Sequence, residues 1–427
     1  MSGHFFTGGA RPGVRSLAAG LAIGAACLPG GASASTLTTI YSFLPGIADG
    51  VNASGPLLAA PDGSLYGATQ YGGTVSATGA CMRGCGTIFK LTPIPKKTTY
   101  AKTVIHKFTA THGFGPIGQI VMAADGSLYG ALSESAYNAP TGLAAGTGTI
   151  FHLVPPTSPT GSWTESVIYA LPSTSSTTYV PLSTPEGVVA DSQGRLYVVA
   201  VNGGPPDQSG NPGGGGIFAL TPPATAGGAW GYQLLHVFHG PAEYVPNADL
   251  TVDSAGWVYG SSAYNGANGA GAGYVFRVAL TPKVSYNVLT TFHSTQGFGN
   301  PTGSVTPGPG GVLYGTAAGN FIPSVSGVAY SLTPPVAPAT NWALKVLHSF
   351  GAGQGAGVSL CVDPSSVLFG GGSSFYTLAP PTGTAQTWKL ADLQQLGSGA
   401  SPYQRMVRDS SGAFYWPSGQ QIFKFQP

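Results

Sequence analysis

The sequence predicts an all-β fold in which one small unit is repeated around a closed ring. A short phrase occurs seven times: an apolar run, a turn rich in Asp, Gly and Ser, and then Leu-Tyr-Gly or a close relative. The copies centre on Tyr66, Tyr129, Tyr197, Tyr259, Tyr314, Phe369 and Tyr415. Their spacing of several tens of residues is typical of repeat architectures and not of a single-core domain.

The first repeat shows four strands in one unit. Residues 55–60 form an apolar run, Pro-Asp-Gly-Ser follows at 61–64, and residues 65–70 form a second run. Because Asp-Gly tolerates positive φ, apolar runs on both sides of it indicate a hairpin. A third strand is expected at 87–92 and a fourth at 100–108. Four antiparallel strands per unit are typical of a propeller blade.

The two ends of the chain predict how the array closes. The seventh unit, 404–425, has three strands and lacks a fourth, whereas 37–43 matches the fourth-strand pattern and precedes the first unit. Pairing 37–43 into the last blade hides the edges that an open array would expose. The sequence therefore predicts a single seven-bladed β-propeller domain over 35–427. The expected blades are about 55–108, 118–171, 186–238, 248–292, 303–350, 357–396, and 404–425 with 37–43.

The N-terminal residues 1–34 are expected to be a secretory signal peptide. Two arginines precede the apolar run 17–28, and Ala-Ser-Ala at 32–34 supplies small residues for cleavage. The apolar run is too short to cross a bilayer. We expect a secreted or periplasmic protein without a transmembrane segment in the mature chain. A lipoprotein processed at Cys27 is the alternative, although Gly24 stands where a larger aliphatic residue is expected.

Charge excludes one class of partner. Charged residues make up 7% of the chain, against roughly 25% in an average soluble domain. Cleavage would leave 16 − 2 = 14 Lys and Arg against 14 Asp and Glu. Without a basic stripe for a phosphate backbone, nucleic acid is not an expected partner.

The remaining cysteines predict one disulfide. An exported chain matures in an oxidising compartment, where Cys81 and Cys85 are expected to form a local disulfide that pins a long loop. A zinc site would need four ligands, and no second pair at metal spacing lies nearby. Cys361 falls in a predicted strand and is expected to be a small buried hydrophobic residue.

Three short strings recur in different units: Asp-Gly-Ser-Leu-Tyr-Gly at 62–67 and 125–130, Gly-Thr-Ile-Phe at 86–89 and 148–151, and Leu-His-x-Phe at 235–238 and 347–350. They resemble the GloVer repeat of exported bacterial choice-of-anchor tandem repeat proteins. The resemblance extends over nearly the whole mature chain and implies export, but it implies no catalytic residue because the motifs are structural. Unlike that family, the sequence ends at Pro427 directly after the last strand, so release or periplasmic residence is expected.

Most candidate acid–base residues have a structural interpretation. Asp caps its own backbone in a turn, and six carboxylates stand at or beside the turn between first and second strands: Asp62, Asp125, Asp191, Asp253, Asp363 and Asp409. Three histidines share one fourth-strand position, where other units carry Tyr or Thr: His106, His236 and His348. We interpret that position as one of packing or hydrogen bonding.

Ligand binding is expected on the face with the long loops, because second-to-third-strand loops and interblade connections emerge there. Alignment of the units places a polar set where the first strands begin, near the channel: Gln119, Glu186, Asp249, Ser304, Ser359 and Arg405. We expect additional aromatic contacts to a ligand from Phe114, Tyr244 and Phe298. Asp249 and Arg405 should lie nearly across the channel. Solvated strand starts are the alternative interpretation of this set.

Two functions remain open. The first is a non-catalytic, monomeric exported propeller that binds a saccharide or protein partner or serves structurally at the cell envelope. The second is an extracellular polysaccharide lyase or glycoside hydrolase that uses Glu186, Asp249, Arg405 and either His239 or His293 at the channel mouth. We expect no cofactor, and no metal, because the inner strands offer too few oxygen ligands. The fold cannot choose between these functions.

Overall fold

The computed structural model describes residues 35–427 apart from 45, 47, 77–79, 135–146, 159–160, 173–179, 206–212, 226, 240–242, 244–246, 248, 264–270, 282, 320–325, 352 and 398. The predicted signal peptide and Tyr244 therefore lie outside the described residues. Within them, no helix is long and apolar enough to cross a membrane.

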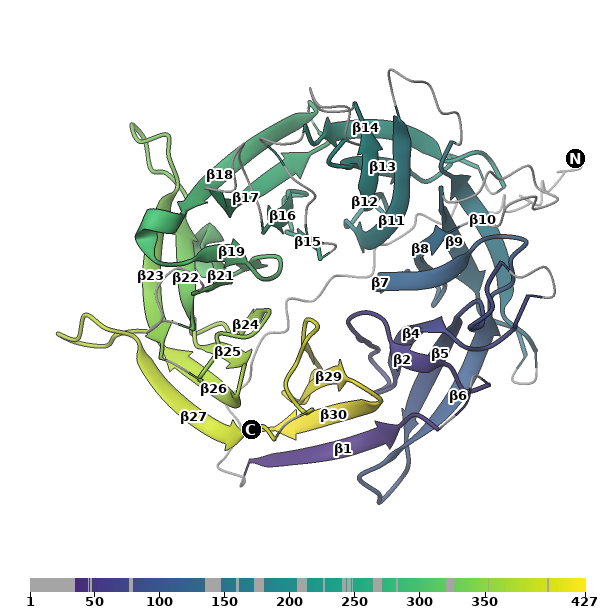
Figure 1. Ribbon diagram of the computed structural model, residues 1–427, viewed down its shortest axis with the longest axis horizontal. Helices are drawn as coiled ribbons and strands as arrows, with labels where there is room; N and C mark the ends of the chain where they lie inside the picture. Colours follow the sequence, from purple (N-terminus) through teal and green to yellow (C-terminus); the bar gives the residue numbers. More distant parts are fainter. Residues whose placement is uncertain are drawn as a thin grey trace, which may run out of the picture.

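Seven antiparallel sheets stand around a central axis, which confirms the predicted seven-bladed β-propeller (Figure 1). Blade 1 contains β2 (Val51–Ala53), β3 (Leu58–Ala59), β4 (Leu65–Tyr71), β5 (Thr87–Pro93) and β6 (Tyr100–Lys107). Blade 2 contains β7 (Phe114–Met122), β8 (Leu128–Glu134), β9 (Thr149–Val154) and β10 (Thr164–Ala170). Blade 3 contains β11 (Val180–Ala190), β12 (Leu196–Gly204), β13 (Gly216–Thr221) and β14 (Gly231–Val237).

The remaining blades follow in chain order. Blade 4 contains β15 (Thr251–Val252), β16 (Val258–Ser262), β17 (Gly271–Ala279) and β18 (Ser285–His293). Blade 5 contains β19 (Gly299–Pro301), β20 (Thr306–Pro307), β21 (Leu313–Ala318), β22 (Gly327–Thr333) and β23 (Ala343–Phe350). Blade 6 contains β24 (Leu360–Val362), β25 (Leu368–Gly371), β26 (Ser374–Ala379) and β27 (Lys389–Gln395). Blade 7 contains β28 (Val407–Arg408), β29 (Phe414–Ser418), β30 (Gln421–Gln426) and β1 (Thr36–Ser42).

The N-terminal strand closes the ring as predicted. β1 pairs antiparallel with β30, from Thr36 opposite Gln426 to Ser42 opposite Gln421. In Figure 1 the purple strand β1 lies beside the yellow strand β30 in blade 7. The last blade thereby gains the fourth strand that the C-terminal repeat lacks.

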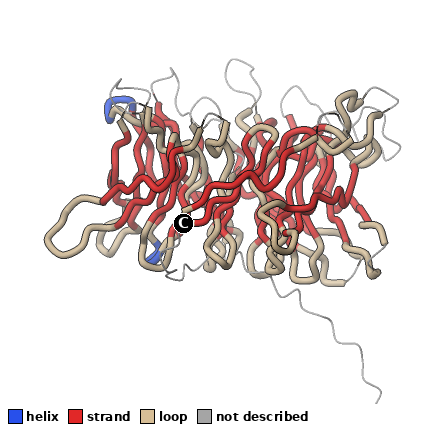
Figure 2. The backbone as a smooth tube through the Cα atoms, turned by 90° about the horizontal axis from the view of Figure 1, so that it is seen from below, coloured by secondary structure: helices blue, strands red, loops and turns tan. Residues whose placement is uncertain are grey.

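The two faces of the ring carry different connections. The 3₁₀ turn η1 (Ser294–Gln296) follows β18 and leads to the next blade, whereas η2 (Pro309–Gly311) joins β20 to β21. They lie on opposite faces (Figure 2). First strands line the inside of the ring, and fourth strands such as β6, β14 and β27 form its outer wall (Figure 1).

The turn aspartates are structural, as the sequence indicates. In each of the six turns, one carboxylate oxygen accepts a backbone N–H from the residue two positions later, as Asp253 does from Ala255 at 2.9 Å. The other oxygen binds the repeat tyrosine in three blades; Tyr259 Oη donates to Asp253 at 2.8 Å. The spacing from Asp to Tyr therefore fixes the turn and places the Tyr hydroxyl within hydrogen-bonding distance of the turn carboxylate.

The glycine of Leu-Tyr-Gly makes room for an aromatic ring on the third strand. Gly130 lies opposite Phe151 in the ladder, and a Cβ at Gly130 would lie 2.5 Å from Cζ of Phe151. The same pairing recurs with an aromatic residue in four more blades: Gly67 with Phe89, Gly260 with Phe276, Gly315 with Tyr330, and Gly370 with Tyr376. The ring thus lies flat over its own sheet.

The same aromatic ring then meets the preceding blade. We call each contact between a fourth strand and the third strand of the next blade a seam, numbered by its two blades. Ring centroids across five seams lie 4.9 to 5.6 Å apart in these pairs: Phe43–Phe89, Phe108–Phe151, Phe238–Phe276, Phe292–Tyr330 and Phe350–Tyr376. Seams 2–3 and 6–7 use leucine instead, Leu171 and Leu396.

The histidines of the fourth strand bind or pack across seams. His106 Nε2 lies 2.9 Å from Glu165 Oε2 on the next blade. His236 Nε2 lies 2.8 Å from Glu243 Oε2. The His236 ring stacks on the Tyr286 ring, with centroids 3.5 Å apart. These contacts agree with a packing or hydrogen-bonding role for this position.

The closing seam 7–1 contains a buried ion pair. Lys102 on β6 is 2% exposed in its side chain, and its Nζ lies 2.9 Å from Asp49 Oδ1. Its ammonium lies over the rings of Phe43 and Phe89, at 4.7 and 5.2 Å. Burial opposes ionisation of Asp49, but hydrogen bonds from Lys102 and from Tyr41 outweigh it and lower the pKa of Asp49. Tyr41 of β1 donates to Asp49 Oδ2 at 2.6 Å, so the ion pair is joined to the N-terminal strand.

Gly130→Ala is expected to destabilise the fold by about 1–3 kcal/mol, because the new methyl group overpacks against Phe151. The measurement is the free energy of unfolding in urea. Gly397→Ala is the matched control, since its Cβ would meet no atom within 4 Å. Equal stability of both variants would contradict the proposed need for glycine.

Asp49→Ala is expected to cost about 3 kcal/mol, because it leaves the Lys102 ammonium buried without its partner. The double variant Asp49→Ala/Lys102→Met should recover part of this loss, since it also removes the unpaired charge. Urea unfolding at neutral pH measures both. A double variant that is less stable than the single one would show that the pair is not the source of the loss.

Candidate functional site

The predicted polar residues lie on or beside the first strands of blades 2 to 7, which line the inside of the ring. We call this set the polar ring: Gln119, Glu186, Asp249, Ser304, Ser359 and Arg405. Their positions follow from the turn aspartates and repeat tyrosines, which fix the register of each first strand relative to its neighbour. Blades 2 to 7 therefore each contribute one residue to the polar ring.

The structure brings Asp249 and Arg405 together. Nη1 of Arg405, from blade 7, lies 3.5 Å from Oδ1 of Asp249, from blade 4. The same nitrogen donates to Thr251 Oγ1 at 2.9 Å and to the carbonyl of Leu250 at 3.3 Å. Because these blades are three positions apart, the arginine side chain links distant parts of the ring.

Asp249 is further engaged on its other oxygen. The N–H of Ser304, on the neighbouring blade, donates to Asp249 Oδ2 at 3.4 Å. The Ser304 hydroxyl is buried and donates to the carbonyl of Tyr259 at 3.1 Å. Asp249 therefore has a cation and a backbone amide as partners, which leaves it poorly suited to act as a free base.

Glu186 is the available carboxylate of the polar ring. Burial raises the pKa of Glu186, and no hydrogen bond or ion pair joins its carboxylate to another described residue. Its backbone is packed against blade 2 so closely that a Cβ at Gly118 would overlap the Glu186 carbonyl oxygen. Gly118 also has a φ of 77°, so its left-handed backbone and this close backbone approach both favour glycine.

Two further polar atoms of the ring lack partners. Oε1 of Gln119 and Oγ of Ser359 are buried and have no hydrogen-bond partner among the described residues. Gln119 directly follows Gly118, so its backbone lies beside that of Glu186. Buried polar atoms normally have partners, and the exceptions call for an explanation such as a bound ligand or water.

The other predicted site residues lie elsewhere. His239 and His293 are exposed, and the N–H of His293 donates to Gln296 Oε1 at 3.0 Å. Phe114 packs against the core between blades 1 and 2. Phe298 packs edge-on against Phe292, with ring centroids 6.1 Å apart. The two phenylalanines thus contribute to blade packing.

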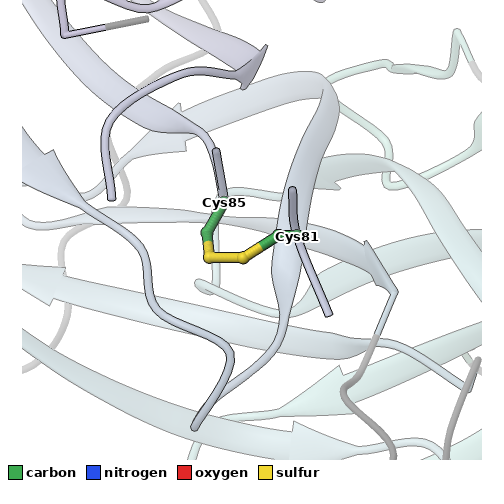
Figure 3. Close-up of a disulfide and its surroundings, with 2 residues drawn as sticks. All are labelled: Cys81 and Cys85. Carbon is green, nitrogen blue, oxygen red and sulfur yellow. A yellow bond between two sulfur atoms is a disulfide. The ribbon is translucent and has the colours of Figure 1, made fainter. Parts of the chain in front are cut away.

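The predicted disulfide between Cys81 and Cys85 is confirmed (Figure 3). Both residues are buried in the core between blades 1 and 2, and the N–H of Gly115 donates to the Cys85 carbonyl at 3.0 Å. The bond therefore anchors a second-to-third-strand loop to the neighbouring blade. Cys361 has no disulfide partner; it is partly buried against the blade 6–7 core, and burial raises the pKa of its thiol to about 11.

No cluster of three or more His, Cys, Asp or Glu side chains suited to a metal ion occurs in the described part of the chain. Sequence reasoning missed Thr251, whose hydroxyl binds Arg405. The available signal was its place two residues after Asp249, which puts both side chains on one face of an extended segment.

No protein-family model matches this chain, and no curated protein matches its sequence. Solved structures do match its fold. A streptogramin B lyase structure gives a TM-score of 0.54 at 14% identity, over 92% of this chain and 97% of that chain. The extracellular domain of the one component system BT4673 from B. thetaiotaomicron gives 0.50 at 11% identity, over 91% of this chain and 39% of that chain. At these identities the likeness shows the β-propeller fold alone.

Glu186→Gln is expected to make the pH dependence of stability flatter. A carboxyl whose folded pKa is raised binds more protons in the folded state, so the wild type loses stability as pH rises from about 4.5 through the raised pKa. The variant should be more stable than the wild type at pH 7, and the gap should narrow toward pH 4. Urea unfolding across this range is the measurement. The exposed Glu134→Gln is the control, and an unchanged pH profile for Glu186→Gln would contradict the burial of its charge.

Proposed function

We propose that this chain is an exported, non-catalytic β-propeller that binds a saccharide at the polar ring. The observation that carries the proposal is the set of acceptor oxygens without partners: Gln119 Oε1 and the Glu186 carboxylate, with the Ser359 hydroxyl as a third polar group. Sugar hydroxyl groups are the donors that these oxygens lack. A neutral ligand also suits a mature chain whose formal charge is zero.

The contacts of Asp249 support binding over hydrolysis. Glycoside hydrolysis generally uses two available carboxyl groups. In the polar ring Asp249 is bound by Arg405 and by the Ser304 amide, so Glu186 is the one carboxyl group of this set without a partner among the described residues. The predicted partners His239 and His293 are exposed and have no described bond to either carboxylate.

Export is supported by two features. Residues 1–34 have the pattern of a secretory signal peptide, and the disulfide between Cys81 and Cys85 suits an oxidising compartment. The resemblance of the repeats to the GloVer repeat of exported bacterial proteins agrees with both. N-terminal sequencing of the protein from its native culture tests this part, with a start near Ser35 as the expected result.

One observation favours the rival function. Burial raises the pKa of Glu186, and a raised carboxyl pKa is a property that general acids share. An extracellular lyase or glycoside hydrolase would use it as the proton donor, with Arg405 stabilising negative charge. The single available carboxyl group makes this the second candidate.

The test is binding and turnover by the mature protein, residues 35–427, on a glycan array and in a polysaccharide-release assay. Gln119→Ala and Glu186→Gln alter the polar ring, and Gln233→Ala is the matched control on the outer strand β14. We expect saturable glycan binding without turnover, weakened at least tenfold by both ring variants and unchanged by the control.

Two results would contradict the proposal. Product release that disappears in Glu186→Gln would establish the enzyme instead. A lack of glycan binding, or binding that Gln233→Ala weakens as much as Gln119→Ala does, would exclude a saccharide site at the polar ring and favour a protein partner.

A further inference from the structure

Seam 3–4 shows how four side chains normally fill the outer half of a blade contact. Phe238, at the end of β14, lies between Phe276 and Tyr286 of the next blade, with centroid distances of 5.4 and 6.1 Å. His236, two residues earlier, stacks on Tyr286 at 3.5 Å. The Phe238 ring is fully buried and fills the space between the two sheets.

Seam 2–3 has the same arrangement with one ring missing. Tyr169 corresponds to His236 and stacks on Tyr232 at 5.1 Å, while Phe218 and Tyr232 lie 5.3 Å apart. Leu171 stands where Phe238 stands in the next seam. Its partner strand also differs, since Val198 occupies the place of the repeat glycine opposite Phe218.

A pocket of about 140 Å³ occupies this place. It is lined by the four side chains of the incomplete seam, together with three residues of the connection to blade 3 and its first strand: Tyr169, Leu171, Phe218, Tyr232, Pro172, Pro181 and Leu182. Tyr232 is 44% exposed, so the pocket opens to the outer wall of the ring.

Volume and lining define the ligand that fits. An apolar protein cavity of about 150 Å³ is large enough to bind benzene, so the pocket has room for one six-membered aromatic ring. No described lining residue is charged, which excludes an ionic group as the main contact. Three aromatic side chains and two prolines line the pocket and favour a planar ring, and the Tyr169 hydroxyl has no hydrogen-bond partner among the described residues.

We infer that seam 2–3 is a binding site for a small neutral aromatic compound of one ring, such as a phenol. The aromatic ring of the ligand takes the place that Phe238 fills in seam 3–4. The hydroxyl group of the ligand forms a hydrogen bond with the Tyr169 hydroxyl group. The site lies between blades 2 and 3 and shares no lining residue with the polar ring, so it does not depend on the saccharide proposal.

The test is titration of the mature protein with phenol, followed by NMR. We expect saturable binding with a dissociation constant on the order of 1 mM, and nuclear Overhauser contacts from the phenol ring to the methyl groups of Leu171 and Leu182. Leu171→Phe supplies the missing ring from the chain itself and should weaken binding at least tenfold. Leu44→Phe makes the same change at an exposed site and should leave binding unchanged.

A two-ring probe completes the design. 2-Naphthol adds a second ring to the one for which a pocket of about 140 Å³ has room, and it should bind at least tenfold more weakly than phenol. The inference is overturned if phenol shows no saturable binding, if its contacts fall outside Leu171 and Leu182, or if a folded Leu171→Phe binds as well as the wild type. The contact measurement uses the wild type, so it decides the question even if Leu171→Phe does not fold.

Discussion

The structure depends on one contact: a glycine on the second strand of a blade that leaves space for an aromatic ring on the third. Because the ring of Phe151 lies flat over Gly130, its outer face is free to meet Phe108 of the preceding blade at 5.0 Å. One glycine thereby sets the distance between two sheets. The same spacing recurs in five of the seven seams, with ring centroids 4.9 to 5.6 Å apart.

The two blades that lack this glycine show that the contact depends on the volumes of the side chains that meet. Blades 3 and 7 carry Val198 and Trp416 in place of the glycine, and their facing fourth strands carry Leu171 and Leu396 in place of phenylalanine. A larger residue on one side is matched by a smaller one on the other. In seam 6–7 the large Trp416 stacks on Phe375 of blade 6, with ring centroids 6.0 Å apart, whereas a pocket remains in seam 2–3.

Much of this architecture could be predicted from the sequence because its causes are local. A turn aspartate binds the amide two residues later, and alternation along a strand assigns each side chain to a face. The seven blades, their closure by β1 and the Cys81–Cys85 bond follow from such short-range patterns. They need no knowledge of what lies across the ring.

The candidate site was less predictable because its contacts are long-range. The alignment of repeats put Asp249 and Arg405 at similar heights, but the reach of the arginine to Thr251 and Leu250 depends on the width of the ring. The same limit applies to Phe114 and Phe298, whose positions in the loops suggested exposure and whose rings instead complete blade cores. Side-chain direction in a loop is decided by the neighbouring blade, which local sequence does not describe.

The pairing of β1 with β30 has a consequence for the order in which the molecule assembles. A chain that emerges from its N-terminus presents β1 first and β30, its hydrogen-bonding partner, last. β1 therefore stays unpaired while the first six blades form. Contacts between residues so far apart in the sequence form slowly, because the entropy cost of closing the loop comes before the contacts stabilise the fold. An unpaired β1 is an open template for other chains during that time. The link that closes the finished ring is therefore the step at which one molecule is most able to join with another.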